Sequence, residues 1–92
     1  MSKPRNISPV TKMVVNRFFE TIDALIARGD IRGIQTYCEA YEIDKRNFYK
    51  QRADEDRGLF QVSWMVPLVT EYKVSAVWLL TGKGTMFKNA KI

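Results

Sequence analysis

The residues with the clearest chemical capacity form one short row from Lys45 to Arg52. The row holds four cationic side chains and no anionic one. Lysine and arginine bind phosphate, and the amides of Asn47 and Gln51 can form paired hydrogen bonds with base edges. On a helix Phe48 turns inward, which leaves the cations facing outward. The row therefore predicts a helix face that contacts both the backbone and the base edges of DNA.

Other interpretations of the same residues have to be weighed. A run of charges is more often a solvated helix face than a binding site. The chain has no histidine, and we find neither a carboxylate pair spaced for one face nor a nucleophile beside a base, so we expect no enzymatic activity. We also expect no metal and no cofactor, because the ligands of a zinc site are missing. The single cysteine, Cys38, is predicted to be a small core residue and not a reactive thiol.

Length and charge narrow the class of protein further. The chain has 92 residues, which predicts one domain, and its formal net charge of +5 favours nucleic acid or an anionic surface as partner. No apolar run has the length of a signal peptide or a membrane span. These features predict a soluble, cytoplasmic protein without a membrane partner or a small-molecule substrate.

Capping residues, prolines and glycines predict five helices that would position the cationic row. The expected helices span residues 9–28, 32–41, 45–52 and 63–72, followed by a short one from Ser75 as N-cap through Leu80. The connection between the second and the third is so short that the two must meet at a tight corner. The predicted division is an N-terminal arm (1–7), a helical domain (8–84) and a C-terminal tail (85–92).

Two stretches carry a resemblance to a known family. Residues 35–49 pair a small residue, Cys38, with two apolar anchors, Ile43 and Phe48, across the corner. Residues 72–84 read Tyr-Lys-Val-Ser-Ala-Val-Trp-Leu-Leu-Thr-Gly-Lys-Gly. The first stretch resembles the helix-turn-helix of lambda-repressor-like regulators, and the second closely resembles the stretch that closes the five-helix domain of phage repressors. With the first helix included, the resemblance covers residues 8–87.

The resemblance implies an all-α, compact five-helix lambda-repressor-like DNA-binding domain with a helix-turn-helix. It further implies a sequence-specific transcriptional regulator of the phage-repressor type, which binds a palindromic operator in double-stranded DNA as a homodimer with its third helix in the major groove. By the same resemblance, the base- and groove-facing residues are Lys45, Arg46, Tyr49 and Lys50. The candidates for phosphate contact are Gln35, Asn47 and Arg52.

The sequence also departs from the family pattern. Glu42 stands in the turn where the family usually has glycine, so the turn must either change its backbone conformation or hold a side chain at positive φ. Arg52 replaces a frequent glutamate, and the loop after the third helix is acidic at residues 54–56. Since acid repels phosphate, this loop should point away from the DNA backbone. Glu42 and the loop leave open an alternative, a protein-interaction module of the same fold without DNA binding, such as an antitoxin-like subunit.

Two further features stay open at this level. Trp64 could pack beneath the loop or contribute to a partner surface. The dimer surface is expected at the fifth helix and in the tail through Met86, Phe87 and Ile92, because exposed apolar residues near a terminus favour pairing.

Overall fold

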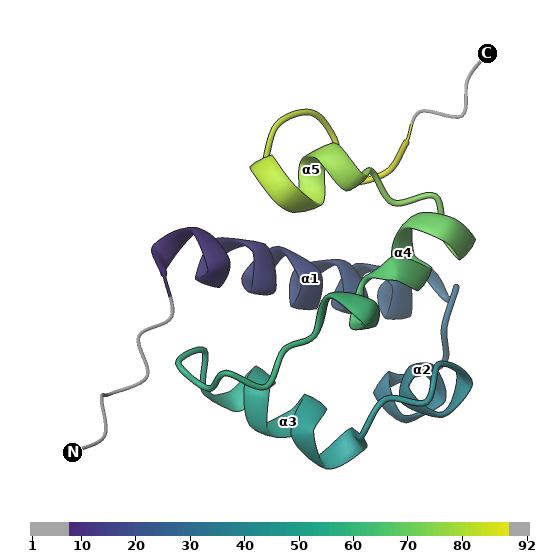
Figure 1. Ribbon diagram of the computed structural model, residues 1–92. Helices are drawn as coiled ribbons and strands as arrows, with labels where there is room; N and C mark the ends of the chain where they lie inside the picture. Colours follow the sequence, from purple (N-terminus) through teal and green to yellow (C-terminus); the bar gives the residue numbers. More distant parts are fainter. Residues whose placement is uncertain (1–7, 89–92) are drawn as a thin grey trace.

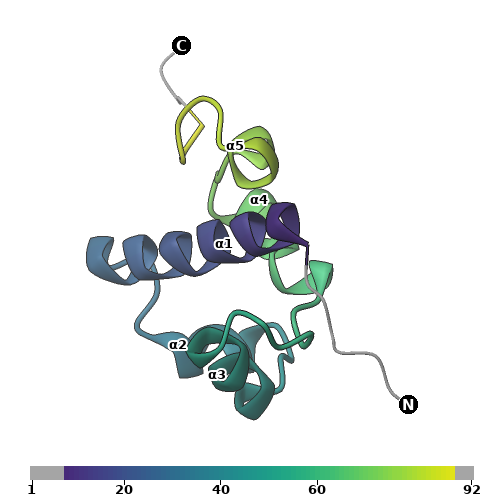
Figure 2. The same cartoon turned by 90° about the vertical axis from the view of Figure 1, so that its left-hand side faces the viewer.

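The computed structural model describes residues 8–88, which form three tiers of helices (Figure 1). The elements are α1 (Pro9–Arg28), α2 (Ile34–Ala40), α3 (Lys45–Ala53), the 3-10 helix η1 (Val62–Trp64), α4 (Val66–Glu71) and α5 (Ala76–Thr81). The long helix α1 lies in the middle, with α2 and α3 on one side and α4 and α5 on the other (Figures 1 and 2). Residues 8–88 contain no β-strand, only an isolated antiparallel bridge between Val74 and Phe87. The predicted all-α class is confirmed.

The ends of α1 follow directly from its capping residues. The Ser8 hydroxyl accepts a hydrogen bond from the Thr11 backbone N–H, and Pro9 occupies the first turn. At the other end Gly29 adopts a left-handed φ of 84°, a conformation in which a Cβ would be strained. The bounds predicted from these residues are confirmed.

The predicted fourth helix is divided in two. The chain forms η1 and then restarts as α4 at Val66, which places Pro67 in the first turn of α4. A continuous helix from Ser63 would have placed this proline in the interior, where it has no N–H to donate and its ring clashes with the preceding turn. The prediction of one helix over residues 63–72 was therefore wrong. α2 is also shorter than predicted, because it begins only after Gly33.

An aromatic core joins the tiers. Phe18 of α1 and Phe48 of α3 are fully buried, with their ring centroids 5.8 Å apart in an edge-to-face arrangement. Trp64 is also buried, and its ring stacks on Phe48 at 5.4 Å. Of the two roles left open for Trp64, the structure shows the core role. Because α1 touches both outer tiers through this cluster, the position of α3 depends on the same core as the position of η1 and α4.

The folded unit extends past the predicted boundary at Gly84. The Arg28 guanidinium lies 4.1 Å from the centroid of the Phe87 ring, and the Lys88 N–H donates to the Lys73 carbonyl at 2.8 Å. Phe87 thus packs against its own chain. The predicted arm (1–7) and Ile92 lie outside the described residues. None of the helices in residues 8–88 combines the length and the hydrophobicity needed to span a membrane.

Candidate nucleic-acid interface

The corner between α2 and α3 is built by backbone geometry and one capping side chain. Glu42 has a φ of 56°, so the chain uses the second of the two expected solutions, a side chain at positive φ. The Ile43 N–H then donates to the Cys38 carbonyl at 2.9 Å. Asp44 begins α3, because its carboxylate accepts from the backbone N–H groups of Arg46 (2.9 Å) and Asn47 (3.2 Å). The predicted cap is confirmed, and it fixes the start of the cationic helix.

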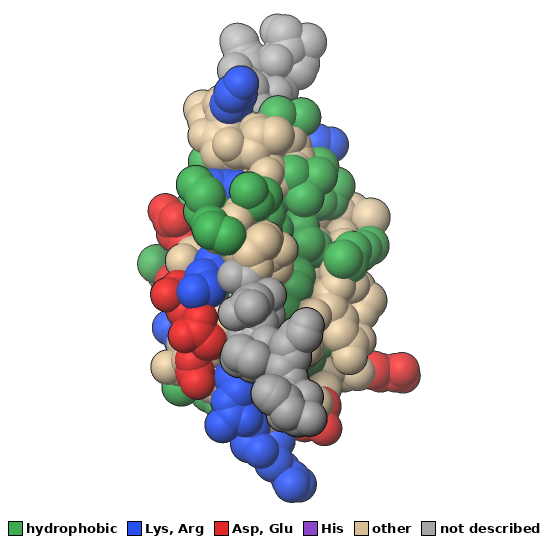
Figure 3. Space-filling view, turned by 60° about the vertical axis from the view of Figure 1, so that its left-hand side comes forward, with side chains coloured by type: hydrophobic (Ala, Val, Ile, Leu, Met, Phe, Trp, Pro, Cys, Tyr) green, Lys and Arg blue, Asp and Glu red, His purple; other side chains and the backbone are tan. Residues whose placement is uncertain are grey.

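The outward face of α3 carries the predicted groove-facing residues. Lys45, Arg46, Tyr49 and Lys50 are all exposed, and together they line one shallow depression of the surface. Within residues 8–88 none of these cations forms an ion pair, and Tyr49 keeps 47% of its surface exposed. In the space-filling view, lysine and arginine side chains gather at the lower end of the molecule, where Figure 1 places α3 (Figure 3).

The three residues expected to contact phosphate lie in different surroundings. The Gln35 side chain is exposed on α2, where its amide donates to Glu39 at 3.0 Å. Asn47 is half-buried on α3. The Arg52 guanidinium donates to both carboxylate oxygens of Asp23 on α1, at 2.9 and 3.2 Å. A phosphate contact by Arg52 would require exchange of this ion pair, whereas Gln35 would exchange only one exposed hydrogen bond.

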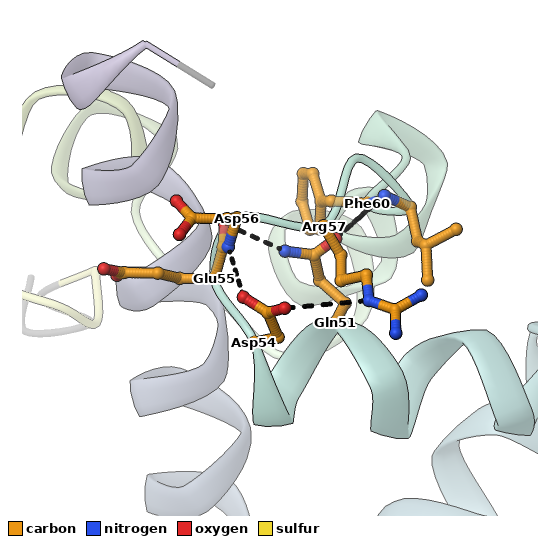
Figure 4. Close-up of polar contacts among 7 residues, drawn as sticks. Gln51, Asp54, Glu55, Asp56, Arg57 and Phe60 are labelled. Atoms are coloured by element: carbon orange, nitrogen blue, oxygen red, sulfur yellow. Dashed lines mark hydrogen bonds and ion pairs between the residues drawn. The ribbon is translucent and has the colours of Figure 1, made fainter. Parts of the chain in front are cut away.

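Gln51 does not take part in the outward face. Its side chain is buried, and its carbonyl oxygen accepts from the backbone N–H groups of Leu59 (2.8 Å) and Phe60 (3.1 Å) (Figure 4). The expectation that Gln51 contacts base edges was wrong, because the loop uses this oxygen. Sequence periodicity could have placed Gln51 beside Phe48, three residues earlier on the helix, but it gives no sign of the loop that returns to it.

The acidic loop is held on the α1 side of the molecule. Asp56 forms an ion pair with Lys12 at 2.7 Å, and Glu55 accepts from the Asn16 amide at 3.3 Å. The Asp56 carboxylate raises the pKa of Lys12. Asp54 accepts from the backbone N–H of Asp56 at 3.0 Å, as Figure 4 shows. These contacts engage the carboxylates of Glu55 and Asp56 with α1, and that of Asp54 with the loop backbone and with Arg57. They reduce the repulsion of the loop toward an anion bound at α3.

The buried titratable groups serve the fold. The Tyr37 hydroxyl donates to the Trp64 carbonyl at 2.6 Å, and burial raises its pKa, which keeps the donor protonated. Burial likewise raises the pKa of the Cys38 thiol, which is the opposite of what a reactive thiolate requires. Among residues 8–88 no three histidine, cysteine or carboxylate side chains are grouped so that they could hold a metal ion.

Comparison of the chain with protein-family models, with curated proteins and with solved structures gave no match. The resemblance to lambda-repressor-like regulators therefore stays a prediction that rests on the residues of this chain.

Proposed function

We propose that this protein is a sequence-specific, DNA-binding transcriptional regulator of the lambda-repressor-like type, with α3 in the major groove. The observation that carries the proposal is the exposed cationic face of α3, on a helix whose start is capped by Asp44 and whose inner side is anchored by Phe48. A helix that is capped and anchored in this way presents its side chains in a fixed geometry. A row of charges that is only solvated does not need such a geometry.

The dimensions suit a duplex. An α-helix with its side chains is about 10–12 Å in diameter, and the major groove of B-DNA is about 12 Å wide, so α3 with its nine residues can lie in the groove. Lys45 and Arg46 lie in its first turn, the end that contacts bases in this motif. Arg46 would pair with guanine O6 and N7, and Tyr49 and Lys50 would follow one turn later. Gln35 and Asn47 would contact phosphate at the rim.

The proposal includes a homodimer. A single helix of this size makes few base contacts, so two half-sites roughly one helical turn apart are needed for high affinity. Such an operator is palindromic because the protein pair has two-fold symmetry. A role on such an operator would place the protein in the cytoplasm with its DNA.

The test is a titration against random-sequence duplex DNA at two salt concentrations. On random-sequence DNA no specific base contact is formed, so the cations of the α3 face act by neutralising nearby phosphates. The variant K45A/R46A/K50A should therefore lose most of the affinity, and the slope of log K against log salt should fall by about 0.9 for each phosphate that is no longer neutralised. The matched control is K73N/K83A/K88A, which removes three exposed cations near α5, on the other side of α1. Asparagine is chosen at position 73 because Lys73 has a φ of 61°.

The two triple variants have the same net charge, so a general charge effect would weaken both equally. Equal loss of DNA affinity in the two triple variants would contradict the assignment of the α3 face as the DNA-binding surface. If the unaltered protein binds no duplex at either salt concentration, the proposal fails, and the alternative of a protein-interaction module takes its place.

A further inference from the structure

Arg52 differs from the other cations of α3. Within residues 8–88 it is the only cation of the row 45–52 that forms an ion pair, and the only one that does not line the shallow depression of the α3 face. Its position on the helix does not account for this difference. Seven residues make nearly two helical turns, so Arg52 leaves α3 on the same side as Lys45. The contacts of its side chain must therefore explain it.

The guanidinium of Arg52 is seated on α1 by two neighbouring residues. Its Nη2 group donates to both carboxylate oxygens of Asp23, at 2.9 and 3.2 Å. Its central carbon lies 5.8 Å from the centroid of the Phe19 ring. Phe19 and Asp23 are four residues apart on α1, so they lie side by side one helical turn apart. Together they hold the guanidinium away from the outward face of α3.

This ion pair is built to be exchanged. The Arg52 side chain is 35% exposed and the Asp23 side chain 55%, and an ion pair that is this open to water is weak. A DNA phosphate offers a guanidinium the same kind of oxygen acceptors as a carboxylate does. The backbone of α3 is fixed by its cap and by buried Phe48, so only the long side chain of Arg52 has to turn.

We propose that Asp23 competes with DNA phosphate for Arg52 and thereby restrains the DNA affinity of the α3 face. In the free protein the carboxylate neutralises Arg52 and holds it on α1. When a duplex lies along α3, a phosphate near the C-terminal end of the helix takes the guanidinium from Asp23. Asp23 is thus a positioning residue, which acts on DNA only through Arg52. This inference rests on the proposed function, because it concerns the same cationic face.

The restraint acts on any duplex. Phosphates carry no sequence information, and every duplex must displace the same carboxylate before it gains the contact with Arg52. The competition can therefore be measured on random-sequence DNA.

The test is a titration of such a duplex at two salt concentrations with the unaltered chain and with Asp23→Asn. The variant should bind about 2- to 5-fold more tightly, since an exposed ion pair no longer opposes binding. Its slope of log K against log salt should become steeper by up to about 0.9, because Arg52 neutralises one more phosphate. A purely structural role of Asp23 would not change this slope.

The matched control is Glu20→Gln. Glu20 is exposed on α1, three residues before Asp23, and within residues 8–88 its carboxylate forms no ion pair. The substitution removes the same charge but releases no cation, so it should give a smaller gain in affinity and leave the salt slope unchanged. In an Arg52→Gln background, Asp23→Asn should likewise give only this small gain, because no guanidinium is left to be released.

A second measurement follows Arg52 itself. In the isotope-labelled, unaltered protein, added duplex should shift the Nε–H resonance of Arg52, as its guanidinium moves from carboxylate to phosphate. Circular dichroism shows whether each variant folds, and Asp23→Ser replaces Asp23→Asn if the latter does not.

The outcomes separate this inference from the proposed function. Equal gains for Asp23→Asn and Glu20→Gln would overturn the inference alone, as would a gain that persists in the Arg52→Gln background or an Arg52 resonance that duplex leaves in place. An unaltered chain that binds no duplex at either salt concentration would overturn the proposed function and this inference with it.

Discussion

The two exposed faces of this molecule differ in almost every chemical respect. The α3 face is cationic and is presented by a capped helix, whereas the groove between α1, α4 and α5 is apolar, and no charged side chain of residues 8–88 lines it. The walls of this groove include Val10, Val14, Val62, Val66, Val69 and Leu80. Both faces border the same central helix. The comparison teaches that one small core can hold two surfaces of opposite chemistry, and that each surface, more than the helical fold itself, indicates its partner.

The shared core gives the largest expected effect, because breaking it should abolish both faces together. Phe48 is fully buried between α1 and Trp64, so Phe48→Ala should lower the free energy of unfolding by about 3–5 kcal/mol. Urea denaturation followed by circular dichroism measures this loss. The adjacent exposed residue provides the control, since Tyr49→Ala should cost less than about 1 kcal/mol. Similar losses for the two variants would mean that Phe48 is not the anchor described above.

A smaller effect is expected from the loop that connects the faces. Residues 54–61 lead from the end of α3 to η1, a wall of the groove, and the Gln51 carbonyl oxygen holds the loop through Leu59 and Phe60. Gln51→Ala leaves these two N–H groups without their acceptor and should cost about 1–3 kcal/mol.

Hydrogen exchange of the two loop amides is the direct measurement for this variant. Both should exchange faster in Gln51→Ala, while Gln51→Glu, which keeps an oxygen acceptor, should restore much of their protection. Unchanged exchange in Gln51→Ala would show that the loop is held by other contacts.

The smallest effect is expected at the corner, where a backbone cost can be separated from a charge. Glu42 has a φ of 56°, and Glu42→Gly should stabilise the fold by roughly 0.5–1 kcal/mol, because the relief of left-handed strain exceeds the added entropy of the unfolded chain. Glu42→Gln removes the charge but keeps the strain. Thermal unfolding should therefore distinguish the two variants. Both variants remove one negative charge from the corner before α3, so both should gain DNA affinity by the same amount. A gain in stability for glutamine alone would contradict the assignment of strain.

The sequence predicted the elements whose ends are set locally. Ser8, Asp44 and Ser75 cap helices through contacts within three residues, and Gly29 and Gly82 end helices at positive φ. These signals require no knowledge of the rest of the chain. The outward positions of Lys45, Arg46, Tyr49 and Lys50 followed equally from helical spacing, and the structure shows all four exposed.

Most of the remaining features depend on contacts between distant residues. The ion pair of Arg52 with Asp23 spans 29 residues, and the groove joins residues of α1 with residues of α4 and α5. No spacing rule connects such positions. The break between η1 and α4 is an exception, because a local signal could have predicted it. Pro67 does not fit the interior of a helix that begins at Ser63.

The proposed division of the two faces can be tested most directly by amide chemical shifts of the isotope-labelled protein. Added duplex DNA should shift the amides of residues 45–53 most strongly, whereas the amides of residues 62–69, beside the groove, should shift less. DNA-induced shifts centred on residues 62–69, or none at residues 45–53, would contradict the assignment of DNA to α3.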